Sequence, residues 1–300
     1  MTTVGMIVDK LNRFAPPAAA CDWDNPGLLL GYHDTEVTKI FVALDATERV
    51  AEEAANAGCE LIVTHHPLIF HGIKCINDDS AEGIKLMDLI SNGISVYSMH
   101  TNFDSCPGGM GDLVCEKLNM RYLGRMEPSG YQPKERENGF AGDKGGDSDG
   151  TALLMKDTTG AEDLLLDPKF SGRDYGVGFI GELPQLMTAE EFAAFVKETF
   201  GLPYVQYYDA GHPIKRVVCC PGSGRGEQGL VTKLYADAFL SGDMGHHEGL
   251  DLNAEGISLI DAGHYGLEHV FVEAMGERLS KYFPELTIMR DTLAFPSAVV

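Results

Sequence analysis

The stretch KIFVALDATERVAEEAANAGCELIVTHHP, residues 39–67, decides the fold. It opens with a short apolar run, Lys39–Leu44, whose β-branched residues are typical of a strand. The Ala- and Glu-rich segment Glu48–Ala57 predicts a helix, and Glu60–Thr64 predicts a second strand. This order indicates a right-handed βαβ unit, in which the two strands are parallel.

The same alternation continues along the rest of the chain. Helices are expected at 3–14, 81–92, 111–118, 188–200 and 265–279, and strands at 94–99, 176–181, 216–220 and 256–261. The pattern predicts an α/β protein with a mostly parallel sheet. The Gly- and Asp-rich run NGFAGDKGGDSDG, residues 138–150, is typical of a surface loop. We therefore divide the chain into a first part of the fold (1–123), a weakly structured connection or remnant insert (124–174) and a second part (175–300).

The composition of the chain limits which classes of partner are expected. The chain has 300 residues, which fit one large or two medium domains, and a formal net charge of -22. Such an acidic surface repels nucleic acid and anionic membranes, so neither is expected as a partner. The start, Met1–Phe14, has no apolar signal segment, and the seven Cys form no CxxC. We expect a cytoplasmic protein with reduced thiols.

Three segments at expected strand ends offer metal ligands. His65 and His66 follow the strand at 60–64; neighbouring side chains of a strand point to opposite faces, so both reach one site only if the strand has ended. Pro67 supports such an end because it cannot continue the hydrogen-bond ladder. Taken alone, the His-His-Pro sequence fits a polar turn better than a metal site.

The second segment is HTNFD, His100–Asp104, where Asp104 is equally consistent with a ligand or an Asx turn. The third is HYGLE, in which His264 and Glu268 are four residues apart and share one helix face. A plain surface His–Glu pair is the alternative there.

Two further segments carry weaker signals. Gly242–Glu248 (GDMGHHE) offers a metal ligand, a general base or a substrate contact, or else a helix start with Asp243 as N-cap. Gly222–Gly226 (GSGRG) would bind phosphate through backbone N–H groups, or it is a tight turn. In the first case the positive charge of Arg225 would offset the acidic surface.

Taken together, the first three segments supply more ligands than one tetrahedral site needs. Two His, an Asp, and a further His and Glu fit two metal ions about 3.5–4 Å apart with a bridging carboxylate. Imidazole and carboxylate ligands suit Zn, Mn, Fe, Co or Ni.

The same segments, in order, resemble the GTP cyclohydrolase I type 2 homologue family, also called Nif-three-like dinuclear metal proteins. The matching stretches are WDNPGL (23–28), KIFVALD (39–45), THHPLIF (64–70), MHTNFD (99–104), SGDMGHH (241–247) and DAGHYGLE (261–268). The resemblance implies two α/β lobes, with mixed, largely parallel sheets, facing a central metal-containing cleft, and a homohexamer. It implies that two divalent ions are held by His65, His66, Asp104, His264 and Glu268, with Glu268 as the bridge.

The resemblance also implies a function. The family name suggests a hydrolase acting on a nucleotide or related small molecule, with opening of the GTP ring by metal-activated water as the sharpest form. His100 and His247 are candidates for proton transfer, and Asn25 and Arg225 are candidates for substrate binding. The alternative is a non-enzymatic, metal-binding regulatory or protein-interaction protein.

Overall fold

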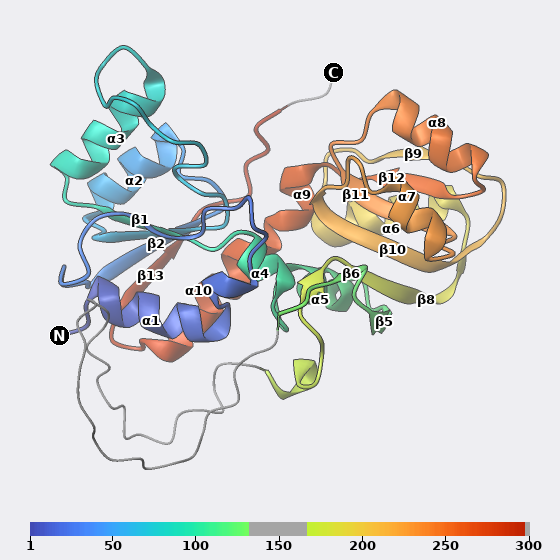
Figure 1. Ribbon diagram of the computed structural model, residues 1–300, viewed down its shortest axis with the longest axis horizontal. Coiled ribbons are helices and arrows are strands. Elements are labelled where there is room, and N and C mark those ends of the chain that lie inside the picture. Colours follow the sequence, from blue (N-terminus) through green and yellow to red (C-terminus); the bar gives the residue numbers. More distant parts are fainter. Residues whose placement is uncertain (132–166, 298–300) are drawn as a thin grey trace.

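The structure is a computed structural model that describes residues 1–131 and 167–297, and it shows two α/β lobes side by side (Figure 1). The expected α/β class with mixed, largely parallel sheets is confirmed. The loop expected at 138–150 lies outside the described residues.

The first lobe is built on a five-stranded sheet of order β1-β4-β3-β2-β13. Its strands are β1 (Gly27–Leu30), β2 (Lys39–Ala43), β3 (Leu61–Thr64), β4 (Ser95–Ser98) and β13 (Thr287–Arg290). Only the edge strand β1 is antiparallel to its neighbour. The helices of this lobe are α1 (Val4–Phe14), α2 (Glu48–Ala57), α3 (Ala81–Ser91) and α10 (Val270–Tyr282).

Helices cover both faces of this sheet, with α1 and α10 on one side and α2 and α3 on the other (Figure 1). The expected βαβ unit is present as β2, α2 and β3, with Val42 paired in parallel register with Val63. Thr47 caps the start of α2 through its side chain, and Gly58 ends the helix in the left-handed conformation that glycine tolerates. Both buried strands run toward the same edge, so the side chains that follow them lie together.

The second lobe has a six-stranded sheet of order β5-β8-β10-β11-β12-β9. Its strands are β5 (Arg121–Gly124), β8 (Phe179–Met187), β9 (Gln206–Tyr208), β10 (Ile214–Ser223), β11 (Ala238–Gly242) and β12 (Ser258–Asp261). Strands β10, β11 and β12 are parallel, whereas the other pairs are antiparallel.

Helices also cover both faces of the second sheet. Buried residues of α5 (Met110–Lys117) and α6 (Ala189–Phe200) pack on one face, and those of α7 (Gln228–Lys233) and α8 (His246–Ala254) on the other. The remaining elements are short: α4 (Thr101–Ser105), α9 (His264–Glu268), the pair β6 (Glu127–Pro128) and β7 (Gly176–Val177), and the 3-10 turns η1 (Pro17–Ala19) and η3 (Pro168–Phe170).

The segment expected as one helix over 265–279 instead crosses between the lobes. It is divided at His269 into α9 and α10. Leu267 packs into the core of the second lobe, whereas Phe271 and Met275 pack into that of the first. After α10 the chain adds β13 to the first sheet, so its last elements complete the lobe that its first elements begin.

Among residues 1–131 and 167–297, none of the helices combines the length and apolar character that crossing a bilayer requires.

Candidate metal centre

The five side chains expected to bind metal converge between the lobes. His65 and His66 directly follow β3, and Asp104 lies in α4, which begins at Thr101 after only two residues that follow β4. His264 and Glu268 are the first and last residues of α9, which begins shortly after β12. Asp104 is therefore in a short helix, and that helix closely follows the end of β4. Ligand binding beyond the carboxyl ends of parallel strands is the general arrangement in α/β proteins.

One half of the site centres on His65, whose side chain is fully buried. Its Nδ1 lies 2.8 Å from the carbonyl oxygen of Met99, which fixes the ring. Its Nε2 lies 3.7 Å from Oδ1 of Asp104 and 3.6 Å from Oε1 of Glu268, and has no hydrogen-bond partner among the residues that the structure describes. A buried, unpartnered imidazole nitrogen facing two carboxylates fits a bound cation, because an unmet polar atom in the interior is costly.

The other half joins His66 and His264. Their Nε2 atoms are 3.2 Å apart. Oε2 of Glu268 lies 3.0 Å from Nε2 of His66 and 2.9 Å from Nε2 of His264. The spacing of four residues places His264 and Glu268 one turn apart on α9, as the sequence predicts.

Glu268 connects the two halves. One of its carboxylate oxygens faces His65, and the other faces His66 and His264. The side chain is buried between them. This orientation is the one that a bridging carboxylate needs.

A carboxylate orients each of three histidines from behind. Nδ1 of His66 lies 2.8 Å from Asp45, and Nδ1 of His264 lies 2.8 Å from Asp243. Nδ1 of His100 lies 2.7 Å from Asp24. Such contacts fix the ring and leave Nε2 free to bind metal or exchange a proton.

Sequence reasoning did not assign these carboxylates. Asp45 ends the matching stretch 39–45, one residue beyond the residue that follows β2, and Asp24 lies within the stretch 23–28. Asp243 lies in the segment 242–248, which offered a metal ligand, a general base or a substrate contact, or else a helix start with Asp243 as N-cap; α8 in fact begins at His246 with Gly245 as its N-cap. For Asp243, which immediately follows the buried strand β11, an acidic residue at a strand end was the available signal.

The local charges suit a cation. Burial raises the pKa of Asp104, so its charged form needs compensation. Burial lowers the pKa of His66, but its hydrogen bonds to Asp45 and Glu268 outweigh that effect and raise it to about 10. Burial likewise opposes charge on His264, yet Glu268 and Asp243 raise its pKa to about 9. Cation binding would therefore displace protons from these rings.

Backbone packs closely against the centre at Gly222 in β10. This residue has a φ of 80°, and a Cβ there would clash with Oε1 of Glu268. The first half of the expected GSGRG turn is thus a strand end that supports the ligand set. Glycine is needed here because the backbone must approach the carboxylate.

The remaining candidates lie in different surroundings. His100 is near the ligands, with its ring centroid 5.2 Å from that of His65. His66 forms one group of close ligand atoms with His65 and His100 and a second with His264 and Glu268. His247 is exposed on α8, where its ring contacts that of His246.

Asn25 and Arg225 are both exposed. The side-chain amide of Asn25 donates to the carbonyl of Ile69, 2.6 Å away. Nε of Arg225 lies 3.6 Å from Glu248. Neither observation brings the side chain to the ligand set.

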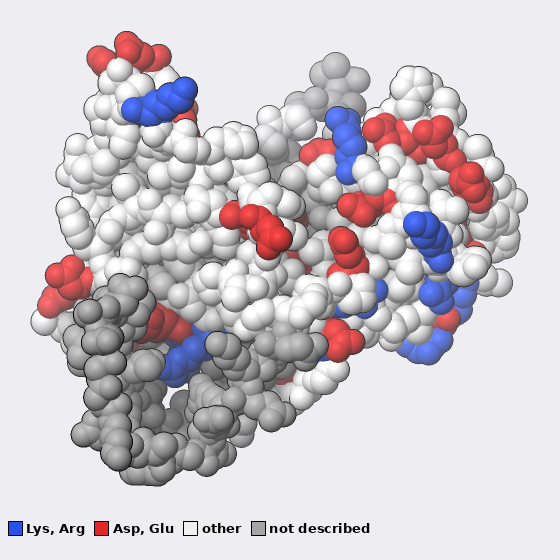
Figure 2. Space-filling model, viewed as in Figure 1, with Lys and Arg blue, Asp and Glu red and all other residues white. Residues whose placement is uncertain are grey.

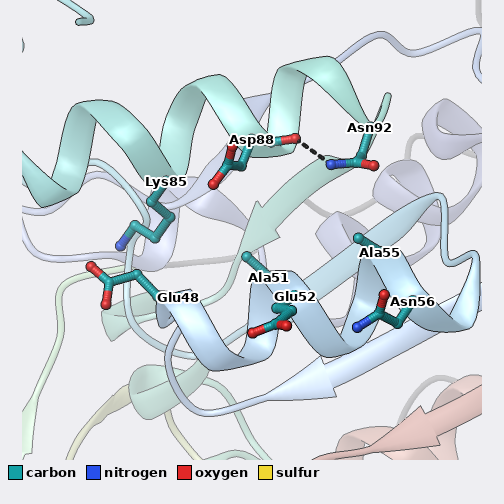
Figure 3. A pocket seen from close by; sticks show the side chains of 8 residues that line it. All are labelled: Glu48, Ala51, Glu52, Ala55, Asn56, Lys85, Asp88 and Asn92. Atoms are coloured by element: carbon teal, nitrogen blue, oxygen red, sulfur yellow. Dashed lines mark hydrogen bonds between the residues drawn. The ribbon is translucent and has the colours of Figure 1, made fainter. Parts of the chain in front are cut away.

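A separate cavity of about 340 Å³ lies between α2 and α3 (Figure 3). It is lined by Glu48, Ala51, Glu52, Ala55, Asn56, Lys85, Asp88 and Asn92, and none of these is a candidate ligand. Acidic side chains are spread over both lobes on the face seen in Figure 2, and the described Lys and Arg there form no continuous stripe.

Known proteins share this fold and much of this sequence. A Clostridium perfringens protein named GTP cyclohydrolase 1 type 2 homolog is 31% identical, over 92% of this chain and 90% of its own. A Staphylococcus epidermidis protein of that name is 28% identical, over 93% of each chain.

Solved structures agree with this likeness. A Staphylococcus aureus hypothetical protein superposes with a TM-score of 0.80 at 27% identity, covering 99% of both chains. A Bacillus cereus protein related to NIF3 superposes with a TM-score of 0.81, covering 100% of this chain and 99% of its own; at 22% identity it supports the fold alone. The model of the Duf34/NIF3 family (NGG1p interacting factor 3) matches residues 2–294. The chain therefore belongs to the Duf34/NIF3 family.

Proposed function

We propose that this protein is a hydrolase that depends on two divalent metal ions and acts on a nucleotide or a related small molecule. The observation that carries the proposal is the division of the ligands into two sets that share Glu268. His65, which also faces Asp104, lies opposite one of its oxygens, and His66 and His264 face the other. The donors are imidazole nitrogen and carboxylate oxygen, which suit Zn, Mn, Fe, Co or Ni.

The ions, when bound, would supply Lewis acidity that activates water and polarises the bond to be cleaved. The protein contributes orientation, because each ligating ring is fixed through its Nδ1 atom. His100 is better placed than His247 to accept a proton at Nε2, since Asp24 holds its Nδ1 and its ring lies beside His65 and His66.

GTP is the most specific candidate substrate, since relatives are named GTP cyclohydrolase 1 type 2 homologs. The reaction would be ring opening by water. The test is turnover of GTP and of a phosphoester panel by protein loaded separately with Zn²⁺, Mn²⁺, Fe²⁺, Co²⁺ and Ni²⁺. Hydrolysis of at least one substrate is expected; none, with two metals per chain verified, would refute the hydrolase.

Elemental analysis tests the site independently of activity. Glu268→Gln should lose most of both ions, because it removes charge from both sets at once. Glu248→Gln is the matched control, since Glu248 lies on α8 beside Arg225. Equal metal content in both variants and in wild type would contradict the assigned site.

A second candidate is a metal-binding protein that acts through a protein partner. The matching family is described by an interaction, as NGG1p interacting factor 3, which favours this reading. Capture of a defined partner only by the metal-loaded protein, together with no turnover, would favour it over the hydrolase.

The assembly and location are also proposals. We propose a cytoplasmic homohexamer without nucleic-acid or membrane partners, in keeping with the family resemblance and the net charge of -22. Light scattering at several protein concentrations measures the assembly; a stable monomer would contradict it.

A further inference from the structure

Three aromatic rings form a corner beside the metal centre. The ring centroids of Trp23 and Phe70 are 6.0 Å apart, those of Trp23 and His100 are 6.0 Å apart, and those of Phe70 and His100 are 6.2 Å apart. Their planes are inclined by 64°, 72° and 82°. The His100 ring also contacts His65 and His66, so the corner adjoins the ligands.

Two of these rings are open to water. Trp23 is 63% exposed and Phe70 is 43% exposed. Large aromatic side chains stabilise a fold mainly when they are buried, so this exposure contributes little to the core. An exposed aromatic pair beside a polar, ligand-rich centre has the composition of a small-molecule site, where apolar rings accompany a few converging polar groups.

The backbone around Trp23 is held firmly. The N–H of Cys21 donates to Oγ1 of Thr101 at 2.9 Å, and Asp24 accepts from the N–H of Thr101 at 2.9 Å. Asn25 donates to the carbonyl of Ile69, which ties this segment to the residue before Phe70. The backbone that carries the rings is thus held before any ligand arrives, which lowers the entropic cost of binding.

We propose that Trp23 and Phe70, with His100 at their side, bind the planar heteroaromatic ring of the substrate, a nucleobase in chemical class. This inference rests on the proposed function and assigns the ring-binding part of the same site. Aromatic side chains bind every nucleobase through its face, whatever its hydrogen-bonding edge. The acidic residues around the centre favour recognition of a neutral ring by stacking over recognition by charge.

The sequence provides its own reporter, because Trp23 is the single Trp of the chain. The experiment titrates guanosine into the full-length protein, without added metal and again with Zn²⁺, and follows Trp fluorescence corrected for absorption. Saturable quenching is expected with guanosine and not with ribose 5-phosphate, which lacks the ring. Phe70→Leu should weaken guanosine binding on the order of tenfold, and Phe70→Tyr should restore it.

The matched control is Tyr32→Leu, since Tyr32 is 77% exposed and outside the corner. It should bind guanosine as the wild type does. Circular dichroism verifies that each variant is folded. Absence of quenching by guanosine, or equal affinity in wild type and Phe70→Leu, would overturn the inference.

Two further outcomes separate this inference from others. If acrylamide fails to quench Trp23 and Trp23→Leu lowers the mass measured by light scattering, the rings belong to a subunit contact and the inference is wrong. Guanosine binding without turnover of any substrate would refute the hydrolase and leave the ring site standing. Turnover of a ring-free phosphoester without guanosine binding would support the hydrolase and refute the ring site.

Discussion

Nδ1 of His66 lies 2.8 Å from Oδ1 of Asp45, and this contact turns Nε2 of the same ring toward Glu268. Removing the charge of Asp45 should therefore weaken metal binding without removing a ligand. For Asp45→Asn we expect affinity for Zn²⁺ to fall about 10–100-fold. Competition with a chromogenic chelator measures this change.

Glu52→Gln is the control for Asp45→Asn, because Glu52 is an exposed acid on α2 that lines the separate cavity. It should bind Zn²⁺ with wild-type affinity. If both variants lose affinity equally, general surface charge, rather than orientation of His66, controls binding.

The carboxylate of Glu60, which lies away from the metal centre, should make the stability of the protein depend on pH. Burial raises the pKa of Glu60, but hydrogen bonds from the backbone N–H groups of Thr38 and Lys39 outweigh that effect and lower it. The folded pKa is thus below the unfolded value of about 4.3. The stabilisation is present above that unfolded value and is lost as pH falls through the folded pKa.

Glu60→Gln removes this linkage. The difference in free energy of unfolding between wild type and variant should be constant at neutral pH and shrink as pH falls below about 4.3. Urea unfolding at several pH values, with chelator present to remove metal effects, measures it. A difference that stays constant across the acidic range would show that the Glu60 hydrogen bonds do not shift its pKa.

Part of the first lobe could be predicted because its signals are local. The βαβ unit that contains α2 follows from apolar runs and helix propensity, both read within residues 39–64. The Thr188 cap of α6 follows from the sequence in the same way. By contrast, β13 was not predicted, because it forms only by pairing with β2, about 250 residues earlier in the chain.

The candidate site divides in the same way. His65, His66 and the His264–Glu268 pair carry local spacing signals, and the structure brings them together. Asp45, Asp24 and Gly222 carry no such signal, because their contacts depend on how distant strand ends meet. The division of the expected helix at His269 has the same cause, because the residues before and after His269 pack into different lobes.

A buried ion pair supports the loop that follows Asp104. The side chains of Asp112 and Arg125 are both fully buried, with Nη1 and Oδ1 2.9 Å apart. Arg125 also donates to the carbonyl of Cys106, and Asp112 accepts from the N–H of Gly108. Arg125→Leu should lower the free energy of unfolding by about 3–5 kcal/mol, because a buried charge loses its main partner. Chemical denaturation measures this loss.

Two comparisons make that prediction specific. Lys169→Met removes an ion pair with Glu116 whose side chains are about half exposed, and should change stability by no more than about 1 kcal/mol. The double variant Asp112→Leu/Arg125→Leu should recover part of the loss, because no fully buried charge remains; Arg173, which also pairs with Asp112 at 2.7 Å, is partly exposed. Equal losses for Arg125→Leu and Lys169→Met would show that burial does not set the cost.

Gly222 and Glu268 provide a steric test of the metal centre. A Cβ at Gly222 would clash with Oε1 of Glu268, the oxygen that faces His65. Gly222→Ala should therefore displace the carboxylate that both ligand sets share. We expect its metal content, measured by elemental analysis after dialysis, to fall well below that of wild type.

Gly226→Ala separates this steric effect from backbone strain. Gly226 also has a positive φ, of 98°, but a Cβ there would meet no atom of the described part of the chain within 4 Å. Each substitution should destabilise the metal-free protein by about 1–3 kcal/mol, because L residues rarely adopt these conformations. Only Gly222→Ala should also lose metal. If Gly226→Ala loses as much metal, strain in the loop rather than contact with Glu268 is responsible, and the close approach of β10 to the centre has no role in binding.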